Sequence, residues 1–411
     1  MEEFDILTLK NGIRVVHKQV THTKVAHCGF VLDIGSRDEE EGEEGLAHFW
    51  EHMVFKGTEK RRSHHIINRL EVVGGELNAY TTKEKVFFYA SVLDLHYEKA
   101  IELLKDITFD SVFPQKEIEK EKSVVLEEMS MYQDTPEDSI LDDFEDMVFA
   151  GHSLGVNILG TQESIKQFNK EKLQAFIRKN LSTDRIIFSS IGNIPFAKIK
   201  KFAEKYLSDI PAIAPKKKRE RFTQYVPACS DVLKPINQSH CMIGNTAYAI
   251  EDPRRLPFFM LVNILGGPGM NSKLNMSLRE KYGYVYNIES SYTPYTDTGL
   301  FYIYFGTEKS QLNKSISLVY KELKYLKEKL LSPVQLQKYK EQLMGQLAMS
   351  EESNLNFMQM MGKSLLDLGR IDSLEDIFLR INKVSAIELQ GLAQEVLEKD
   401  RLSILTYRPE N

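Results

Sequence analysis

Apolar and polar residues alternate along residues 7–33, and the turn-forming pair Asn11-Gly12 lies near the start of this segment. A period of two places one face of a strand against a core, and an Asn-Gly pair is typical of a tight hairpin turn. We therefore expect a hairpin that leads into a sheet. Residues 45–55 change to helical spacing, so a helix should follow these strands.

A second strand pair is predicted over residues 77–93, which are rich in Tyr, Thr, Phe and Val. Two stretches with helical spacing come next, at residues 97–107 and, behind Pro114, at residues 115–132. Proline is tolerated in the first turn of a helix and disrupts a helix interior, so Pro114 should mark the start of the second one. The first half is thus a set of strands followed by helices.

The second half repeats this order. Residues 290–306 form another aromatic, Thr-rich strand pair, residues 312–330 have helical spacing, and Pro333 opens a further helix that reaches residue 347. The parallel indicates an internal duplication, and chance similarity between two helix-rich halves is the alternative. The predicted fold class is α+β, with two similar domains that each contain a mostly antiparallel sheet packed with helices.

The length of 411 residues exceeds what one hydrophobic core usually organises, which also favours two domains. Between the halves, residues 211–221 are bounded by proline at the start and rich in Lys and Arg. No aromatic residue interrupts this basic run, so a solvated linker is a better interpretation than a nucleic-acid site. We expect an N-terminal domain over residues 1–213, a linker over 214–232 and a C-terminal domain over 233–411.

The net charge of −6 gives no general attraction to nucleic acid or to an anionic membrane, so neither is an expected partner. Cys28, Cys229 and Cys241 are too few and too scattered for a disulfide framework, which fits a reduced compartment. The start of the chain is acidic and no apolar run approaches the roughly 20 residues that span a bilayer. These features predict a cytoplasmic location.

His48, Glu51 and His52 lie close together in the predicted helix over residues 45–55. At 100° per residue, His52 is about 40° from His48, and Glu51 is about 60° away on the other side. Two imidazoles at this spacing can bind one zinc ion, and the nearby carboxylate can accept a proton from the attacking water. The sequence therefore predicts an inverted-zincin metal site. The alternative is an ordinary helix that happens to carry two histidines.

A tetrahedral catalytic zinc needs a third protein ligand. The helix behind Pro114 has an inner stripe that includes two carboxylates where apolar residues would be expected, namely Ile118, Glu121, Val125 and Glu128. Buried carboxylates need partners, so this stripe offers candidate ligands. Glu127 has a simpler explanation as surface charge, although the spacing alone does not exclude it.

These motifs resemble the insulinase and pitrilysin family of inverted zincins, and the chain length is similar to the half-length branch that contains the processing peptidases. The resemblance covers most of the chain and is carried by residues 45–58 (GLAHFWEHMVFKGT), 74–81 (GGELNAYT) and 121–128 (EKSVVLEE). It implies that His48, His52 and Glu128 are the metal ligands of the first domain. It also implies that Glu121 supports the site from behind the ligands.

The same resemblance assigns residues that contact substrate. In the second half, Arg279 and Tyr286 match an arginine and a tyrosine that meet the bound peptide near the metal, so the C-terminal domain should contribute them without binding metal itself. Asn78, Ala79 and Tyr80 match a sheet edge to which the peptide adds as a strand. Without the resemblance, each set would be an ordinary turn or hairpin.

The resemblance implies a zinc-dependent endopeptidase with one Zn²⁺ per chain, in which Glu51 acts as general base on small or unfolded peptides inside an enclosed chamber. A half-length chain should complete that chamber as a homodimer, or as a heterodimer with a related subunit. The alternatives are a non-catalytic scaffold subunit of the same fold and an unrelated metal-dependent amidase or lactonase. Intact residues at positions 48, 51, 52 and 128 argue against the scaffold.

Overall fold

The computed structural model describes residues 4–215 and 218–410, which form two compact units. The first unit comprises Met1–Met129, Val156–Arg219 and Met349–Ser373, and the second comprises Ser130–Gly155, Glu220–Ala348 and Leu374–Asn411. Most of each half of the chain lies in its own unit, and one segment of each half lies in the other. The contiguous division into residues 1–213, 214–232 and 233–411 stays a prediction, and residues 216–217 of the expected linker lie outside the described residues.

The first unit is built on a six-stranded sheet with the order β1-β2-β6-β3-β5-β4. Its strands are β1 (Asp5–Thr8), β2 (Arg14–Gln19), β3 (Val25–Leu32), β4 (Glu76–Thr81), β5 (Val86–Leu93) and β6 (Ile186–Gly192). Strands β1 and β2 form the expected hairpin around Gly12, whose φ of 95° lies in the region that favours glycine. Only β2 and β6 pair in parallel, and β4 is an edge strand.

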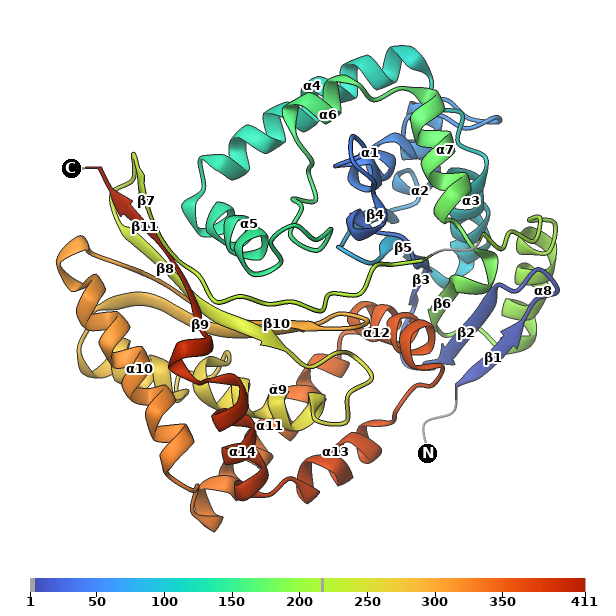
Figure 1. The fold of residues 1–411 in the computed structure, drawn as a ribbon. Helices are drawn as coiled ribbons and strands as arrows, with labels where there is room; N and C mark the ends of the chain where they lie inside the picture. The colour runs from blue at the N-terminus through green and yellow to red at the C-terminus, as the bar shows by residue number, and fades with distance from the viewer. Residues whose placement is uncertain (1–3, 216–217, 411) are drawn as a thin grey trace. The chain divides into compact units, whose positions relative to one another are not determined.

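Helices cover both faces of this sheet. They are α1 (Leu46–Met53), α2 (Ser63–Glu71), α3 (Tyr97–Phe109), α4 (Gln115–Gln133), α6 (Gln162–Lys166), α7 (Lys170–Asn180), α8 (Phe196–Leu207) and α12 (Asn354–Leu368). Alternate strand residues serve the two sides: Phe30 belongs to the core shared with α1 and α3, whereas Val31 packs with residues of α12. Helix α12 comes from the second half of the chain and packs against β3 and β6 (Figure 1).

A short chain of polar side chains crosses the apolar core between β2, β6 and α3. The Tyr97 hydroxyl donates to Ser190 Oγ at 2.7 Å, and Ser190 Oγ lies 2.9 Å from Nδ1 of His17. Nε2 of His17 lies 2.8 Å from the carbonyl oxygen of Ile194, which can only accept. The neutral imidazole with its proton on Nε2 satisfies every partner. On the opposite face of β6, Ser189 donates to the carbonyl of Met358 at 2.6 Å.

The second unit contains a five-stranded sheet with the order β7-β11-β8-β10-β9. Its strands are β7 (Cys229–Lys234), β8 (Ser239–Ala247), β9 (Val285–Pro294), β10 (Gly299–Thr307) and β11 (Ser403–Pro409). Its helices are α5 (Pro136–Val148), α9 (Arg255–Gly266), α10 (Leu312–Glu328), α11 (Pro333–Glu351), α13 (Leu374–Lys383) and α14 (Ala386–Val396). Helix α5 comes from the first half of the chain and packs on β8 and β11.

The two sheets follow the same plan. The order β2-β6-β3-β5-β4 in the first unit corresponds to β7-β11-β8-β10-β9 in the second, and the first pair of each series is parallel while the others are antiparallel. This agreement supports the duplication expected from the sequence. The predicted α+β class, with two mostly antiparallel sheets packed with helices, is confirmed. Within the described residues, no helix combines the length and apolar character needed to cross a membrane.

Candidate metal centre

Helix α1 begins at a sharply defined point. Gly45 precedes it with φ of 94°, and a Cβ at this position would lie 2.5 Å from the carbonyl oxygen of Leu159, so the turn requires glycine. The carboxylate of Glu39 accepts hydrogen bonds from the backbone N–H groups of Gly45 at 2.9 Å and Ala47 at 2.7 Å. These bonds satisfy two donors that the first turn of a helix leaves free, and they fix the backbone next to His48.

The helix brings its two histidines together with a carboxylate from α4. The Nε2 atoms of His48 and His52 are 3.2 Å apart. Glu128 places Oε1 3.8 Å from Nε2 of His48 and Oε2 3.4 Å from Nε2 of His52. Within the described residues, these three side chains are the group of His, Cys, Asp or Glu residues whose atoms converge closely enough to hold a metal ion.

The geometry and protonation of this group fit zinc. When two nitrogens bind the same tetrahedral zinc ion at about 2.0–2.1 Å, they lie about 3.3 Å apart. The Nε2 atoms of His48 and His52 have nearly this separation. Burial, with a contribution from the neighbouring His52, lowers the pKa of His48 to about 3, so its ring is neutral at physiological pH. Neutral imidazole is the form that binds metal. Glu128 is only partly buried and could supply an oxygen ligand.

Glu121 contacts His52 on the side of the ring opposite Glu128. Its Oε1 atom lies 2.9 Å from Nδ1 of His52, and its Oε2 atom accepts from Nζ of Lys56 at 2.6 Å. Burial disfavours the charged carboxylate, but the contacts with His52 and Lys56 outweigh it and lower the pKa of Glu121. An ionised Glu121 keeps the proton of His52 on Nδ1 and leaves Nε2 free to bind metal.

Glu51 lies on α1 beside the histidines and contacts the end of β4. The Thr81 hydroxyl donates to Oε2 of Glu51 at 2.6 Å. Burial raises the pKa of the Glu51 carboxyl, and the Thr81 hydrogen bond and His52 partly oppose this rise. A raised pKa makes the carboxylate a stronger proton acceptor.

The residues expected at the substrate edge lie on β4, which is unpaired on one side. Asn78 is exposed, and Ala79 and Tyr80 are partly buried. The Tyr80 ring stacks on Phe87 of β5, with ring centroids 4.3 Å apart, so this side chain braces the strand. The free backbone of an edge strand can accept an added strand, and the role of these residues in binding substrate stays a prediction.

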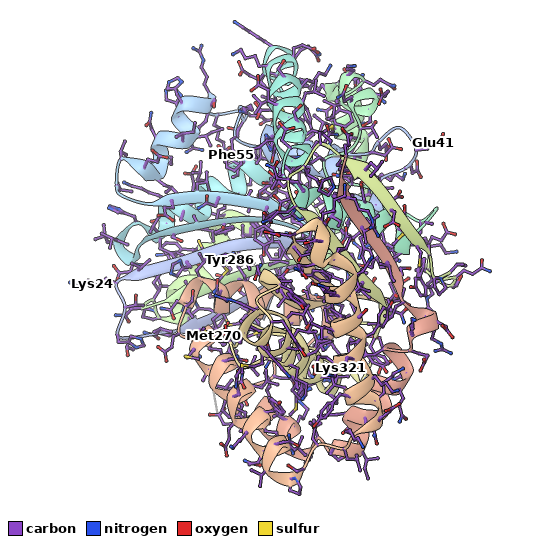
Figure 2. The ribbon with its side chains drawn as sticks, turned by 90° about the vertical axis from the view of Figure 1, so that its left-hand side faces the viewer. Lys24, Glu41, Phe55, Met270, Tyr286 and Lys321 are labelled. Atoms are coloured by element: carbon purple, nitrogen blue, oxygen red, sulfur yellow. The ribbon has the colours of Figure 1, made fainter. Side chains whose placement is uncertain are left out.

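Arg279 and Tyr286 belong to the second unit. Arg279 lies in the π-helical segment Asn275–Lys281. Tyr286, which is labelled in Figure 2, is near the start of the edge strand β9. The Arg279 guanidinium is 5.6 Å from the centre of the Tyr286 ring, and Tyr286 is 86% exposed. The structure thus pairs them with each other, and their expected contact with substrate stays a prediction.

The sequence did not predict a role for three residues near the candidate metal site: Glu39, Lys56 and Thr81. Lys56 follows His52 by four residues, a spacing that would place both side chains on one side of a continuous helix, but α1 ends at Met53. Thr81 directly follows the expected substrate edge but had no assigned role. Glu39 is one of several acidic residues before α1, and nothing in the pattern distinguishes it from its neighbours.

Family models match both halves of the chain. The model described as insulinase (peptidase family M16) matches residues 14–162, and the model described as peptidase M16 inactive domain matches residues 167–343. His48, His52 and Glu128 lie within the first match. Arg279 and Tyr286 lie within the second.

Individual relatives match almost end to end. The uncharacterized zinc protease YmxG of Bacillus subtilis (strain 168) is 33% identical over 400 residues, covering 96% of this chain and 95% of the relative. An uncharacterized zinc protease of Rickettsia bellii (strain RML369-C) is 31% identical over 404 residues, covering 98% and 97%.

Solved structures share the fold at lower identity. A peptidase M16 inactive domain from Pseudomonas fluorescens has a TM-score of 0.92 at 18% identity, covering 100% of this chain and 98% of the other. A protease from Helicobacter pylori has a TM-score of 0.91 at 19% identity and covers all of both chains. These structures show the shared fold. The family models and the relatives that match over almost the whole chain establish that it belongs to the insulinase family of peptidases, family M16.

Proposed function

We propose that this chain is a zinc-dependent endopeptidase that cleaves small or unfolded peptides. The observation that carries the proposal is the convergence of His48, His52 and Glu128, with Glu51 on the same helix as the two histidines. The names of the relatives, which call them zinc proteases, support the same activity. A non-catalytic scaffold subunit would not need a buried, neutral His48 beside a His52 that Glu121 orients.

His48, His52 and Glu128 would hold one zinc ion, which when bound supplies a Lewis acid that activates water and polarises a carbonyl. Glu51 accepts a proton from the water that attacks the scissile carbonyl. The protonated carboxyl then returns this proton to the departing amine, so the base is regenerated in each turnover. Glu121 keeps His52 in the tautomer and orientation that this arrangement requires.

The proposed peptide-binding element is the free edge of β4, where Asn78, Ala79 and Tyr80 lie. Main-chain hydrogen bonds to such an edge do not depend on side-chain identity, so they suit substrates of varied sequence. Only an extended segment can pair in this way, which selects unfolded peptides over folded proteins. The half-buried Arg279 and the exposed Tyr286 would contact the peptide or the oxyanion that forms during cleavage.

The proposal extends to assembly. The metal ligands come from the first half of the chain and the arginine–tyrosine pair from the second, and a symmetric dimer would let each chain supply what the other's site needs. The proposed active form is therefore a homodimer, or a heterodimer with a related subunit, that encloses a chamber. Tyr286, with most of its side chain in solvent, is available for such a contact.

The test combines metal analysis with cleavage of a quenched pool of unstructured peptides. The purified protein should contain about one zinc per chain and cleave the pool. Glu51→Gln should keep its zinc and lose about 10³-fold in turnover, because a base is removed and no ligand is. Glu119→Gln is the matched control, since Glu119 is on the surface of α4 and pairs there with Lys122. Full activity in Glu51→Gln, or no cleavage by zinc-loaded protein, would overturn the proposal.

A further inference from the structure

Among the described residues of β4, Thr81 is the one whose side chain hydrogen-bonds to the proposed base, Glu51. Its hydroxyl lies 2.6 Å from Oε2 of Glu51 and donates to it. No other hydrogen bond to the Glu51 carboxylate occurs among the described residues, so Thr81 alone restrains its orientation by hydrogen bonding. With Oε2 engaged, Oε1 is the oxygen that remains available to accept a proton.

The backbone around Thr81 is held on several sides. Thr81 pairs with Val86 of β5, and the turn that follows is closed by a 2.7 Å bond from the Thr82 N–H to the Lys85 carbonyl. The Arg37 N–H donates to the carbonyl of Lys83 at 2.7 Å and ties this turn to the segment before α1. A hydroxyl on such a backbone is a fixed donor, as a group that orients a catalytic side chain must be.

We propose that Thr81 is a positioning residue for Glu51: its hydrogen bond holds one carboxylate oxygen and thereby presents the other in a single orientation for proton transfer. This inference rests on the proposed function. It also links two parts of the site, because Thr81 directly follows the strand edge proposed to bind the peptide. The peptide backbone and the base would then be aligned by one rigid strand, which reduces the loss of rate that misplacement causes.

The test compares Thr81→Val, which keeps the branched shape suited to a strand and removes the hydroxyl, with Thr81→Ser, which keeps the hydroxyl. Thr81→Val should lower kcat about 10- to 100-fold with KM, zinc content and thermal midpoint close to wild type. Thr81→Ser should restore kcat to within about threefold. A purely structural role would instead change zinc content or thermal midpoint together with kcat.

Glu51→Gln is measured in the same series to separate the two proposals. If Glu51→Gln is impaired but Thr81→Val keeps kcat within threefold of wild type, the positioning role alone is overturned. It is also overturned if Thr81→Ser is as slow as Thr81→Val. If Thr81→Val loses zinc, Thr81→Ala replaces it, and loss of zinc in both variants shows that Thr81 is structural. If Glu51→Gln is fully active, the proposed function fails and the inference fails with it.

Discussion

The Nδ1 atom of His52 lies 2.9 Å from Oε1 of Glu121, and on the other side of the same ring Nε2 lies 3.4 Å from Oε2 of Glu128. Both carboxylates project from α4, two helical turns apart. One helix therefore supplies a proposed metal ligand and the partner that orients another ligand. Glu121 orients the His52 ring, and Glu128 faces the ring nitrogen that is free to bind metal.

Removal of the charge at Glu121 should weaken zinc binding. In Glu121→Gln, the amide that replaces the carboxylate accepts less strongly from His52 and pairs less well with Lys56, so the zinc affinity should fall about 10- to 100-fold. Competition with a fluorescent chelator measures this change. Glu119→Gln, on the exposed face of the same helix, should bind zinc as wild type does. Equal affinities in all three proteins would contradict the supporting role of Glu121.

Glu128 and its neighbour Glu127 provide a second comparison. Glu128 points toward both histidines, whereas Glu127 is exposed. Glu128→Gln should lose zinc during dialysis against a mild chelator, because one of three ligands is gone, and Glu127→Gln should keep it. Zinc content measured by mass spectrometry distinguishes them. Retention of zinc by Glu128→Gln under conditions that leave wild type loaded would remove Glu128 from the ligand set.

Mixing two inactive variants tests the proposed shared site. Glu51→Gln lacks the base and Tyr286→Phe lacks the tyrosine hydroxyl, so in a mixed dimer that shares residues one site has both intact and the other has neither. Random exchange makes about half of the dimers mixed, which sets an activity ceiling near a quarter of wild type if the sites are independent. Peptide cleavage after verified subunit exchange gives the result. No recovery, or activity in a strictly monomeric fraction, would exclude the shared arrangement.

Burial makes His17 a source of pH-dependent stability. It lowers the pKa of His17 below its ordinary value of 6.5, although the Ile194 carbonyl partly opposes this. The unfolded chain then binds the proton more readily than the folded one, so the stabilisation is present above about pH 6.5 and is lost as pH falls toward the lowered pKa.

His17→Gln removes the titration and keeps a donor for Ile194. It should be less stable than wild type by about 1–3 kcal/mol at pH 7.5, because the fit to Ser190 is lost. This difference should shrink between pH 6.5 and pH 5. Urea unfolding at a series of pH values measures it. A difference that stays constant over this range would show that His17 does not titrate on unfolding.

Local sequence patterns predicted α1 and α4, the two helices that carry the candidate metal ligands. The helix behind Pro114 begins at Gln115 as expected, and its stripe of Ile118, Glu121 and Val125 is buried. The histidine pair could be predicted because both residues lie on one helix, where spacing alone fixes the geometry. The choice between Glu127 and Glu128 depended on the direction of α4 relative to α1, which the residues alone left open.

Contacts between distant segments were harder to anticipate. Strand β6 was not predicted, because its run of buried residues has helices on both sides of the sheet and lacks the alternation that marks a half-exposed strand. The position of α12 in the first unit could likewise not be predicted, since residues 354–368 are distant in sequence from the rest of that unit. Thr81 meets Glu51 only because β4 packs against α1. Such contacts depend on tertiary structure and leave no periodic signal.

The two adjacent serines of β6 have a consequence for how the sheet assembles. Ser190 bonds to His17 on one face, and Ser189 bonds to the carbonyl of Met358 on the other. A slip of one residue between β2 and β6, which are far apart in sequence, would turn each serine to the wrong side and leave polar groups unpaired in an apolar layer. Apolar side chains alone tolerate such slips more readily. The hydrogen bonds of Ser189 and Ser190 thus favour one register between β2 and β6 over registers shifted by one residue.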